Sequence, residues 1–507
     1  MGGNYALSSI RTFRAPLHVD FNVTNGCNLL CSHCHSSSGS HLPNELTAEE
    51  ILSAIRQLHS LGVISIAFAG GEPFIRKDIL EILRFACSLP GWSVKVISNG
   101  VFLRSAQFLD ELAQSCPGLA VNISLDGPNG LQQNYLRKHR TLEPNELFSQ
   151  VVEGINRTRN AGLRTSVNFA ITRQSIHNLL NTYDYVFNEL KLSSMVAIKF
   201  FPGGFGRQHL DALEIPFIEW AELFASVSKM RIDGYLPGLQ VSVPAAWEFY
   251  LPLIFFNVDI NAAETAWNYR APLREDGYAE FTSVGDSAGI GELAVAADGN
   301  IYPSILMIGN ERFLCGNVRK QTIAQIWQSS QVLKFIRRLT IEDLDISCRQ
   351  CELVSICGGG SRSRAVTHSD DYGARDYLCP LLRRVRDQVN PKPFAPSFTP
   401  DTGDLPAVRV CRIGGVTVLA DSAGCEVRTG RLLFRGNEEM SRIIALAIDR
   451  PNAADIESLA RQYHLTDSEL LALVRQSLKK LTQAGCPSFW DRAWEDAEPL
   501  PSEDMRP

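Results

Sequence analysis

Strand-like and helix-like segments alternate along the first half of the chain. Apolar and polar residues alternate from Leu17 to Val23, and residues 47–61 then show the periodicity of an amphipathic helix that Thr47 can cap, with Glu50 three positions on. Strand-like segments recur at 64–69, 93–98, 120–125, 164–171 and 195–201, and helical patterns follow them. Six βα units predict a parallel sheet with right-handed crossovers, in a partial (β/α)6 TIM-like barrel. Functional residues are therefore expected directly after the strands, where such sheets bind ligands.

Composition narrows the class of protein. The 507 residues carry a net charge of -6, which argues against a protein that coats nucleic acid. No apolar run approaches the roughly 18 residues of a membrane span, and the N-terminus has no secretory pattern, so we expect a cytoplasmic protein without membrane contact. Because the cytosol is reducing, clusters among the 13 cysteines are better interpreted as metal ligands than as disulfides.

Changes in composition divide the chain into expected regions. Residues 232–300 show no clear period, although Asp298-Gly299 predicts a hairpin turn. Three strands (Val408–Ile413, Val416–Leu419, Arg431–Phe434) and helices near 437–449, 453–464 and 467–485 predict a small α+β domain at the C-terminal end. The expected organisation is an N-terminal extension (1–16), the barrel (17–235), a bridging region (236–300), a cysteine-bearing module (301–389), a Pro-rich linker (390–409), the α+β domain (410–486) and a disordered tail (487–507).

The first cysteine cluster follows the first strand. Cys27, Cys31 and Cys34 lie within eight residues, and thiolates at this spacing can hold one face of an iron–sulfur cube. Three protein ligands to a four-iron cluster leave one iron open to a small molecule. The alternative is a zinc site with His33 or His35 as the fourth ligand; otherwise these histidines are expected behind the ligands or at the surface.

This CxxxCxxC spacing resembles the signature of radical S-adenosylmethionine (SAM) enzymes. The likeness extends to Gly70-Gly71-Glu72-Pro73 after the second strand, and it implies a [4Fe-4S] cluster on Cys27, Cys31 and Cys34 with SAM bound to it. It further implies that the two glycines let the backbone approach the methionine amino group, whose charge Glu72 offsets. Ser124 and Arg137 match positions that hold the SAM carboxylate, and Asn168 could meet the ribose. The full set of expected SAM-binding residues is Gly70, Gly71, Glu72, Ser98, Asn99, Ser124, Asp126, Arg137 and Asn168.

A second cysteine set, Cys348, Cys351, Cys357 and Cys379, resembles the SPASM extension of radical SAM peptide maturases. The resemblance implies one auxiliary [4Fe-4S] cluster on these four residues. A complete SPASM module holds a second auxiliary cluster, but Ser304, Gln321 and Ser361 stand at positions where cysteine is expected, so we predict that this inner cluster is absent. Cys315, beside Gly316, is a displaced ligand, a hydrogen-atom donor or a small buried apolar residue.

The C-terminal α+β domain resembles the winged-helix, PqqD-like fold that binds precursor peptides. In that family a leader peptide adds as a strand beside the third strand, which would place a leader on residues 410–486. A winged helix can also bind DNA, but the nearly balanced charge of this region lacks the usual phosphate-binding excess, so no nucleic acid partner is expected.

Together these features predict a radical SAM enzyme that modifies a ribosomally synthesised precursor peptide through a 5′-deoxyadenosyl radical. The expected product is an oxidative C–C, ether or thioether crosslink, with flavodoxin or ferredoxin as the reductant. One alternative is a peptide epimerase, for which Cys315 would return the hydrogen. Others are a small-molecule or haem-pathway enzyme and, from a different class, a non-catalytic iron–sulfur winged-helix regulator that binds DNA.

Overall fold

The main sheet organises the molecule. The computed structural model describes residues 13–269 and 284–380, together with the backbone of four strands between residues 409 and 437. The sheet has ten strands in the order β12-β11-β10-β1-β3-β4-β5-β7-β8-β9, and every neighbouring pair from β10 to β9 is parallel. These parallel strands are β1 (His18–Thr24), β3 (Ser65–Gly70), β4 (Ser93–Ser98), β5 (Ala120–Ser124), β7 (Arg164–Ile171), β8 (Met195–Lys199), β9 (Leu239–Ser242) and β10 (Glu292–Val295).

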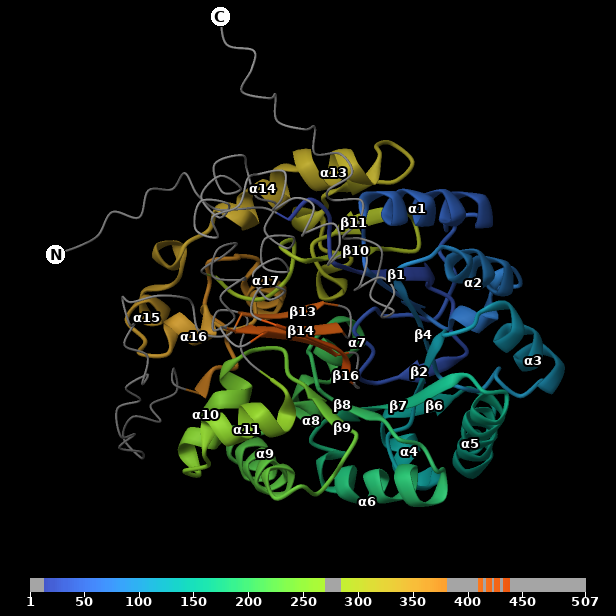
Figure 1. Ribbon diagram of the computed structural model, residues 1–507, viewed down its shortest axis with the longest axis horizontal. Coiled ribbons are helices and arrows are strands. Elements are labelled where there is room, and N and C mark those ends of the chain that lie inside the picture. The colour runs from blue at the N-terminus through green and yellow to red at the C-terminus, as the bar shows by residue number, and fades with distance from the viewer. Residues whose placement is uncertain are drawn as a thin grey trace, which may run out of the picture.

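Helices cover the outside of this sheet. Figure 1 shows α1, α2, α3, α5 and α6 following one another around the curved sheet. The predicted capping box is present, because the Thr47 side chain accepts from the Glu50 amide and Glu50 accepts from the Thr47 amide. The helices are α1 (Ala48–Leu61), α2 (Ile79–Ser88), α3 (Ala106–Ser115), α5 (Pro144–Asn160), α6 (Leu179–Asp184) and α9 (Phe217–Ile232). The six predicted βα units are therefore confirmed as elements.

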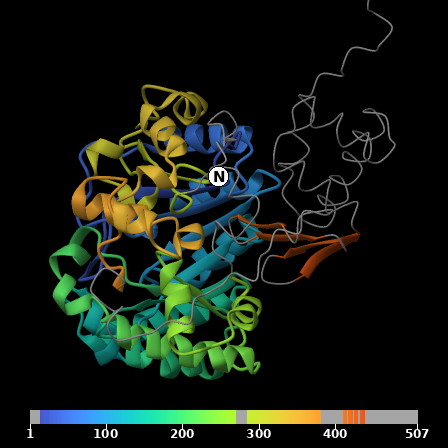
Figure 2. The same cartoon turned by 90° about the vertical axis from the view of Figure 1, so that its left-hand side faces the viewer.

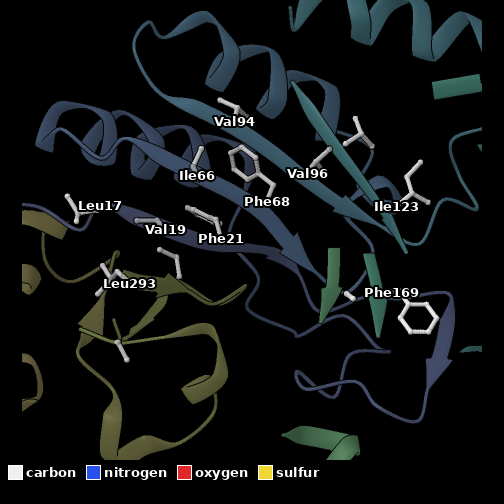
Figure 3. Packing of buried hydrophobic residues seen from close by; sticks show 14 of the residues in the cluster. Leu17, Val19, Phe21, Ile66, Phe68, Val94, Val96, Ile123, Phe169 and Leu293 are labelled. Carbon is white, nitrogen blue, oxygen red and sulfur yellow. The ribbon is translucent and has the colours of Figure 1, made fainter. Parts of the chain in front are cut away.

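The core lies between the sheet and these helices. Val19, Phe21 and Val23 of β1 are completely buried, as their alternation with polar residues predicts. Phe21 packs against Phe68 of β3 with ring centroids 6.0 Å apart, and Figure 3 shows side chains of neighbouring strands meeting in the same layer. This packing holds the strand ends in a fixed relation to one another.

The sheet is larger than the sequence pattern predicted. β9 comes from the region that was expected to be a bridge, and its four residues are too few to show a period. β10 is the first strand of the predicted hairpin, and its parallel pairing with β1 was not expected. The predicted hairpin is confirmed, since β10 pairs antiparallel with β11 (Asn300–Tyr302) across Asp298-Gly299. β12 (Gly316–Asn317) then pairs antiparallel with β11. The start of the cysteine-bearing module is thus built onto the barrel sheet.

The C-terminal strands form a small antiparallel sheet of their own (Figure 2). Its order is β13 (Arg409–Ile413), β14 (Val416–Asp421), β15 (Gly424–Arg428) and β16 (Leu432–Asn437). Three strands were expected, so β15 corrects that prediction. The expected helices after residue 437, most of the Pro-rich linker, the tail and residues 1–12 lie outside the described residues. Within the described part of the chain, no helix is long and apolar enough to cross a bilayer.

Candidate functional site

A cavity of about 310 Å³ opens at the carboxyl ends of the parallel strands. Its volume is at the lower end of the range for small-molecule sites. The structure brings most of the predicted site residues to its wall, namely Cys27, Cys31, Cys34, Gly70, Gly71, Ser98, Asn99, Ser124, Arg137 and Asn168. These residues therefore lie together at the strand ends, where the sequence analysis expected them.

The three cysteines of the first cluster lie in the segment after β1, and Cys31 ends the short strand β2 (Leu29–Cys31) within it. The Cys27 amide donates to the Gly39 carbonyl at 2.9 Å, and the Cys34 amide donates to the Cys31 carbonyl at 3.2 Å. Burial raises the pKa of the Cys31 thiol to about 12, although nearby Arg137 acts in the opposite direction. Such a thiol becomes a thiolate only with a bound cation or metal. Three thiols that share one cavity wall therefore fit an iron–sulfur cluster.

Single-ion ligation finds less support at the same loop. Among the described residues, no three His, Cys, Asp or Glu side chains converge closely enough to hold one metal ion. His33 and His35, the candidate fourth zinc ligands, line the cavity and are half-buried. Burial lowers the pKa of His33 to about 4, so its imidazole is neutral near pH 7, which is the form that binds a metal. The zinc alternative is therefore disfavoured by the distances between the side chains and not by their protonation.

The two glycines after β3 are needed for packing against β1. A Cβ on Gly71 would overlap the carbonyl oxygen of Gly26, and one on Gly70 would overlap that of Thr24. Gly70 also has φ +127°, which side chains rarely adopt. The sequence analysis explained these glycines by the close approach of the backbone to the cofactor. The structure gives a second reason, because only glycine lets the end of β3 pack directly against Thr24 and Gly26.

Glu72 lies behind the cavity wall, and its expected role of offsetting the charge of the SAM amino group stays a prediction. Its carboxylate accepts from the Ser98 hydroxyl at 2.9 Å and from the Asn99 amide at 2.7 Å, and the side chain is completely buried. Burial raises its pKa to about 7, against the effect of these hydrogen bonds. Glu72 therefore fixes Ser98 and Asn99, which do line the cavity.

Arg137 and Asp126 divide their roles in a similar way. Arg137 lines the cavity beside Ser124, and its Nε donates to the fully buried Asp126 at 2.5 Å. Burial alone would lower the pKa of Arg137, but the negative charge of Asp126 has the larger effect, so the pKa of Arg137 is raised. Asp126 orients the guanidinium from behind the wall, and its expected place among the SAM-binding residues stays a prediction. Asn168 lines the cavity as expected, and its Oδ1 accepts from Asn122 at 3.1 Å.

Several wall residues were missed by the sequence interpretation. The most polar is Lys199, the last residue of β8, and beside it Phe200 and Phe201 continue the wall. The rule that ligands bind at strand ends could have identified Lys199. Leu306, from the short helix η5 (Ile305–Met307), had no such signal because it reaches the cavity from the cysteine-bearing module.

The second cysteine set is assembled from a compact loop region. Cys348 and Cys351 lie one turn apart, and the Cys351 amide donates to the Cys348 carbonyl at 3.0 Å. Cys357 closes α16 (Val354–Cys357), and burial raises its pKa to about 12. Cys357 and Cys379 pack against the same buried apolar residues. The set is therefore brought together, as the spacing predicted.

Cys315 lies elsewhere, in the main core. It is 8% exposed, its thiol points to the Phe313 carbonyl at 3.6 Å, and it is not among the residues that line the cavity. Its position gives no geometric support to the predicted roles of hydrogen donor or extra ligand, and it fits the third interpretation, a small buried residue. Ser304 and Ser361 are likewise engaged, since Ser304 donates to Glu292 at 2.8 Å and Ser361 accepts from the Arg364 amide.

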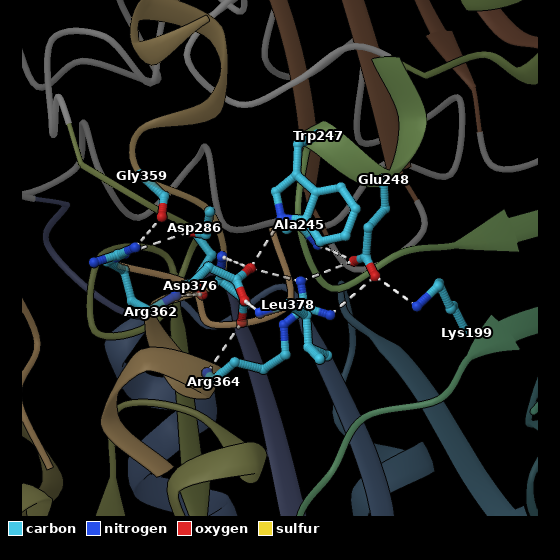
Figure 4. A network of polar contacts seen from close by, with 12 residues as sticks. Lys199, Ala245, Trp247, Glu248, Asp286, Gly359, Arg362, Arg364, Asp376 and Leu378 are labelled. Carbon is cyan, nitrogen blue, oxygen red and sulfur yellow. Dashed lines mark hydrogen bonds and ion pairs between the residues drawn. The ribbon is translucent and has the colours of Figure 1, made fainter. Parts of the chain in front are cut away.

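A buried ionic network joins the cavity wall to the second cysteine set (Figure 4). Lys199 contacts Glu248 of α10 (Trp247–Phe255) at 2.8 Å, and Glu248 accepts two hydrogen bonds from Arg364 of α17 (Arg362–Ser369). Arg364 also donates to Asp376 at 2.6 Å, and the Asp376 carbonyl accepts from the Cys379 amide at 3.1 Å. Sequence patterns gave no sign of this connection.

Comparison with known proteins identifies the family. The model of the radical SAM superfamily matches residues 21–186, and that of the SPASM iron–sulfur cluster-binding domain matches residues 287–352. A probable GTP 3′,8-cyclase of Methanocella arvoryzae is 30% identical over 232 residues, which cover 44% of this chain and 70% of that protein. The chain belongs to the radical SAM superfamily.

Other relatives extend the likeness along the chain. An AdoMet-dependent haem synthase of Methanosarcina barkeri is 25% identical over 366 residues, which cover 72% of this chain and 96% of that protein. The crystal structure of Streptococcus suis SuiB bound to its precursor peptide SuiA aligns with a TM-score of 0.54 at 17% identity, covering 73% of this chain and 76% of that one. This structural likeness establishes the radical SAM α/β fold.

Membership of the radical SAM superfamily makes the protein an enzyme, which overturns the alternative of a non-catalytic DNA-binding regulator. The radical SAM domain implies a [4Fe-4S] cluster with SAM, and the SPASM domain implies auxiliary iron–sulfur clusters. The cavity fits the first of these groups because it combines three thiols, two glycines and one guanidinium on a single wall.

Proposed function

We propose that the enzyme modifies a ribosomally synthesised precursor peptide and installs an oxidative C–C, ether or thioether crosslink. The observation that carries this proposal is the antiparallel sheet that follows the two cysteine sets. Within its described strands β16 is an edge strand, paired with β15 alone. An edge strand offers free backbone groups to which an extended peptide can add. This is the strand beside which a PqqD-like domain would receive a leader, and we assign leader binding to residues 410–486.

The residues of the cavity would then have distinct tasks. Cys27, Cys31 and Cys34 would hold the cluster, and the guanidinium of Arg137 would bind the SAM carboxylate through its planar fork. Asn168 would contact the ribose. The reduced [4Fe-4S] cluster with bound SAM would supply a 5′-deoxyadenosyl radical, which removes a hydrogen atom from a carbon of the substrate. The surrounding wall excludes water and holds the target carbon in line.

A crosslink is favoured over epimerisation for a structural reason. Epimerisation requires a thiol to return a hydrogen at the reacting carbon, and Cys315, the candidate for this role, does not line the cavity. Crosslinking removes two hydrogens and requires a redox group instead. Cys348, Cys351, Cys357 and Cys379 would hold one auxiliary [4Fe-4S] cluster, which is a group of this kind. Flavodoxin or ferredoxin is the proposed external reductant.

The test uses the full chain, reconstituted anaerobically with iron and sulfide. With SAM and dithionite we expect 5′-deoxyadenosine. A search for a short reading frame beside the gene supplies candidate precursor peptides, and co-expression with the true precursor should give a product lighter by two hydrogens. Absence of 5′-deoxyadenosine, or a preparation that holds zinc in place of iron, would contradict the proposal. A product of unchanged mass that gains deuterium from heavy water would indicate epimerisation.

A haem-pathway reaction is the second candidate, favoured by the alignment with nearly the whole length of an AdoMet-dependent haem synthase. Titration of the reconstituted enzyme with an iron porphyrin distinguishes the two. A shifted Soret band and a SAM-dependent change in porphyrin mass would support this candidate, whereas an unperturbed porphyrin would leave the peptide reaction.

A further inference from the structure

Arg362, the first residue of α17, is a fully buried cation in the cysteine-bearing module. Its guanidinium donates to the carbonyls of Tyr372 at 2.8 Å and Ala374 at 2.6 Å. It also donates to the carbonyl of Gly359, which Figure 4 shows, and to that of Gly360 at 3.3 Å. All four acceptors are backbone carbonyls, which stabilise the cation through their dipoles but carry no net charge.

These acceptors lie on the two segments that carry the last two cysteines of the second set. Gly359 and Gly360 follow Cys357, and the Gly360 amide donates to the Cys357 carbonyl at 3.2 Å. The acceptors at 372–374 precede Cys379. The guanidinium therefore bridges the backbone segments that hold two of the expected cluster ligands.

The charge of Arg362 acts on thiols of the same set. Burial raises the pKa of Cys348, and burial together with the charge of Asp376 raises the pKa of Cys357 to about 12; the guanidinium opposes both shifts. Charges interact strongly in a protein interior, where the dielectric is low and salt screens little. Arg362 is therefore placed to stabilise negative charge on these two ligands.

Arg362 lacks the carboxylate partner that a buried cation normally has. By contrast, Arg364 on the same helix pairs with Glu248 at 2.9 Å and with Asp376 at 2.6 Å. Within the described part of the chain, no carboxylate makes an ion pair with the Arg362 guanidinium, and Asp286 accepts from the Arg362 backbone amide at 3.1 Å instead. A four-iron cluster on the second cysteine set would supply the missing counter-charge, because four thiolates make such a cluster negative and reduction adds a further negative charge.

We propose that Arg362 is a positioning residue for the auxiliary cluster, which holds the segments of Cys357 and Cys379 in place and raises the reduction potential of the cluster through its buried charge. The potential of an iron–sulfur cluster depends on net charge as well as on hydrogen bonds and solvent exposure. A cation close to the cluster favours the reduced, more negative form. The inference rests on the proposed function, since a cluster that is easier to reduce suits the electron acceptor that crosslinking requires.

The experiment measures this reduction potential by redox titration followed by electron paramagnetic resonance. The full chain carries Cys31→Ala, so that only the auxiliary cluster contributes, and is reconstituted anaerobically with iron and sulfide. Arg362→Gln should make reduction about tenfold or more less favourable, which lowers the potential by about 59 mV or more for one electron. Arg362→Lys keeps the charge and should show less than half of this fall. The matched control is Arg349→Gln next to Cys348, which removes a cation whose side chain is 38% exposed and should have a smaller effect because water screens it.

Each outcome decides the inference. An unchanged potential in Arg362→Gln, an equal fall in Arg362→Gln and Arg362→Lys, or a fall as large in Arg349→Gln would overturn it. If Arg362→Gln loses the auxiliary iron while Arg362→Lys retains the iron and the potential, the charge is required and the inference is supported. If only Arg362→Lys loses the iron, the potential of Arg362→Gln decides. Loss of the iron from both variants would leave Arg362 a purely structural role and overturn the inference.

The proposed function is scored separately, by the mass of the peptide after co-expression with the enzyme that keeps Cys31. A lowered potential in Arg362→Gln together with a peptide of unchanged mass would leave the inference standing and contradict the crosslink. A loss of two hydrogens together with an unchanged potential would leave the crosslink standing and contradict the inference. Absence of iron from the Cys31→Ala chain would overturn the inference together with the auxiliary cluster itself.

Discussion

Arg364 of α17 and Glu248 of α10 bind each other by two hydrogen bonds of 2.9 and 3.2 Å, with both side chains completely buried. The two residues are 116 positions apart, and their contact ties the helix beside the cavity to the cysteine-bearing module. A buried ion pair is stable only while both partners remain, because removal of one leaves an uncompensated charge in the interior.

Arg364→Met should therefore reduce the free energy of unfolding by about 3–5 kcal/mol, since both Glu248 and Asp376 lose their shared partner. Denaturant unfolding followed by fluorescence measures the change. The matched control is Arg312→Met, which breaks an ion pair with Asp370 whose side chains are 63% and 53% exposed, and its effect on stability should be far smaller because water screens this pair. An Arg364 variant as stable as this control would show that the network does not connect the two regions energetically.

Gly71→Ala should disrupt the fit between β3 and the cysteine loop. The new Cβ would overlap the Gly26 backbone, which cannot move without moving Cys27. Overpacking of this kind costs about 1–3 kcal/mol, and here it should also weaken SAM binding, measured by equilibrium dialysis. Gly39→Ala is the control, because a Cβ there meets no atom within 4 Å although the residue lies beside the same loop. Equal SAM affinity in the two variants would contradict the argument.

The strands and helices of the barrel could be predicted from the sequence because the patterns that indicate them involve residues close together in the chain. Alternation in β1 and the capping box at Thr47 and Glu50 each depend on residues a few positions apart, and both are present in the structure. The cysteine sets were recognisable for the same reason. Short strands are different: β9 and β15 have four and five residues, and their pairing depends on neighbours distant in the chain.

Roles within the site were harder to predict than membership of it. Glu72 and Asp126 belong to the predicted SAM-binding set, and in the structure each is completely buried and holds a neighbour that lines the cavity. A motif places a residue near a site and does not show whether its side chain faces the ligand. Arg319 and Glu50 are in contact although they are 269 residues apart in the sequence. Such a contact depends on the complete fold, and the spacing of residues in the sequence does not predict it.

Substitution of the two cysteine sets should separate their functions. Cys31→Ala should remove the first cluster and abolish 5′-deoxyadenosine formation, whereas Cys348→Ala should retain that reaction and lose peptide modification. Because each set would hold four irons, each variant should contain about half the iron of the unsubstituted enzyme, measured by chemical analysis and electron paramagnetic resonance. Cys87→Ala, outside both sets, should keep the full content. Loss of 5′-deoxyadenosine in Cys348→Ala with the first cluster intact would show that the sets are not independent.

The pH dependence of stability should reveal Glu292, which starts β10 and accepts hydrogen bonds from Ser287 and Ser304, both at 2.8 Å. Burial raises its pKa from 4.5 to about 7, with Asp20 acting in the same direction. Between these values the folded protein binds more protons than the unfolded chain, so stability should fall as the pH rises through this window and level off above it. In Glu292→Gln the uncharged amide can accept a hydrogen bond from one serine hydroxyl through its oxygen and donate one to the other through its nitrogen. Its melting temperature, measured anaerobically across the same window, should therefore fall less steeply with pH, by an amount equivalent to about 3 kcal/mol. Parallel profiles for the two proteins would mean that the Glu292 carboxyl is already ionised at the lower end of the window.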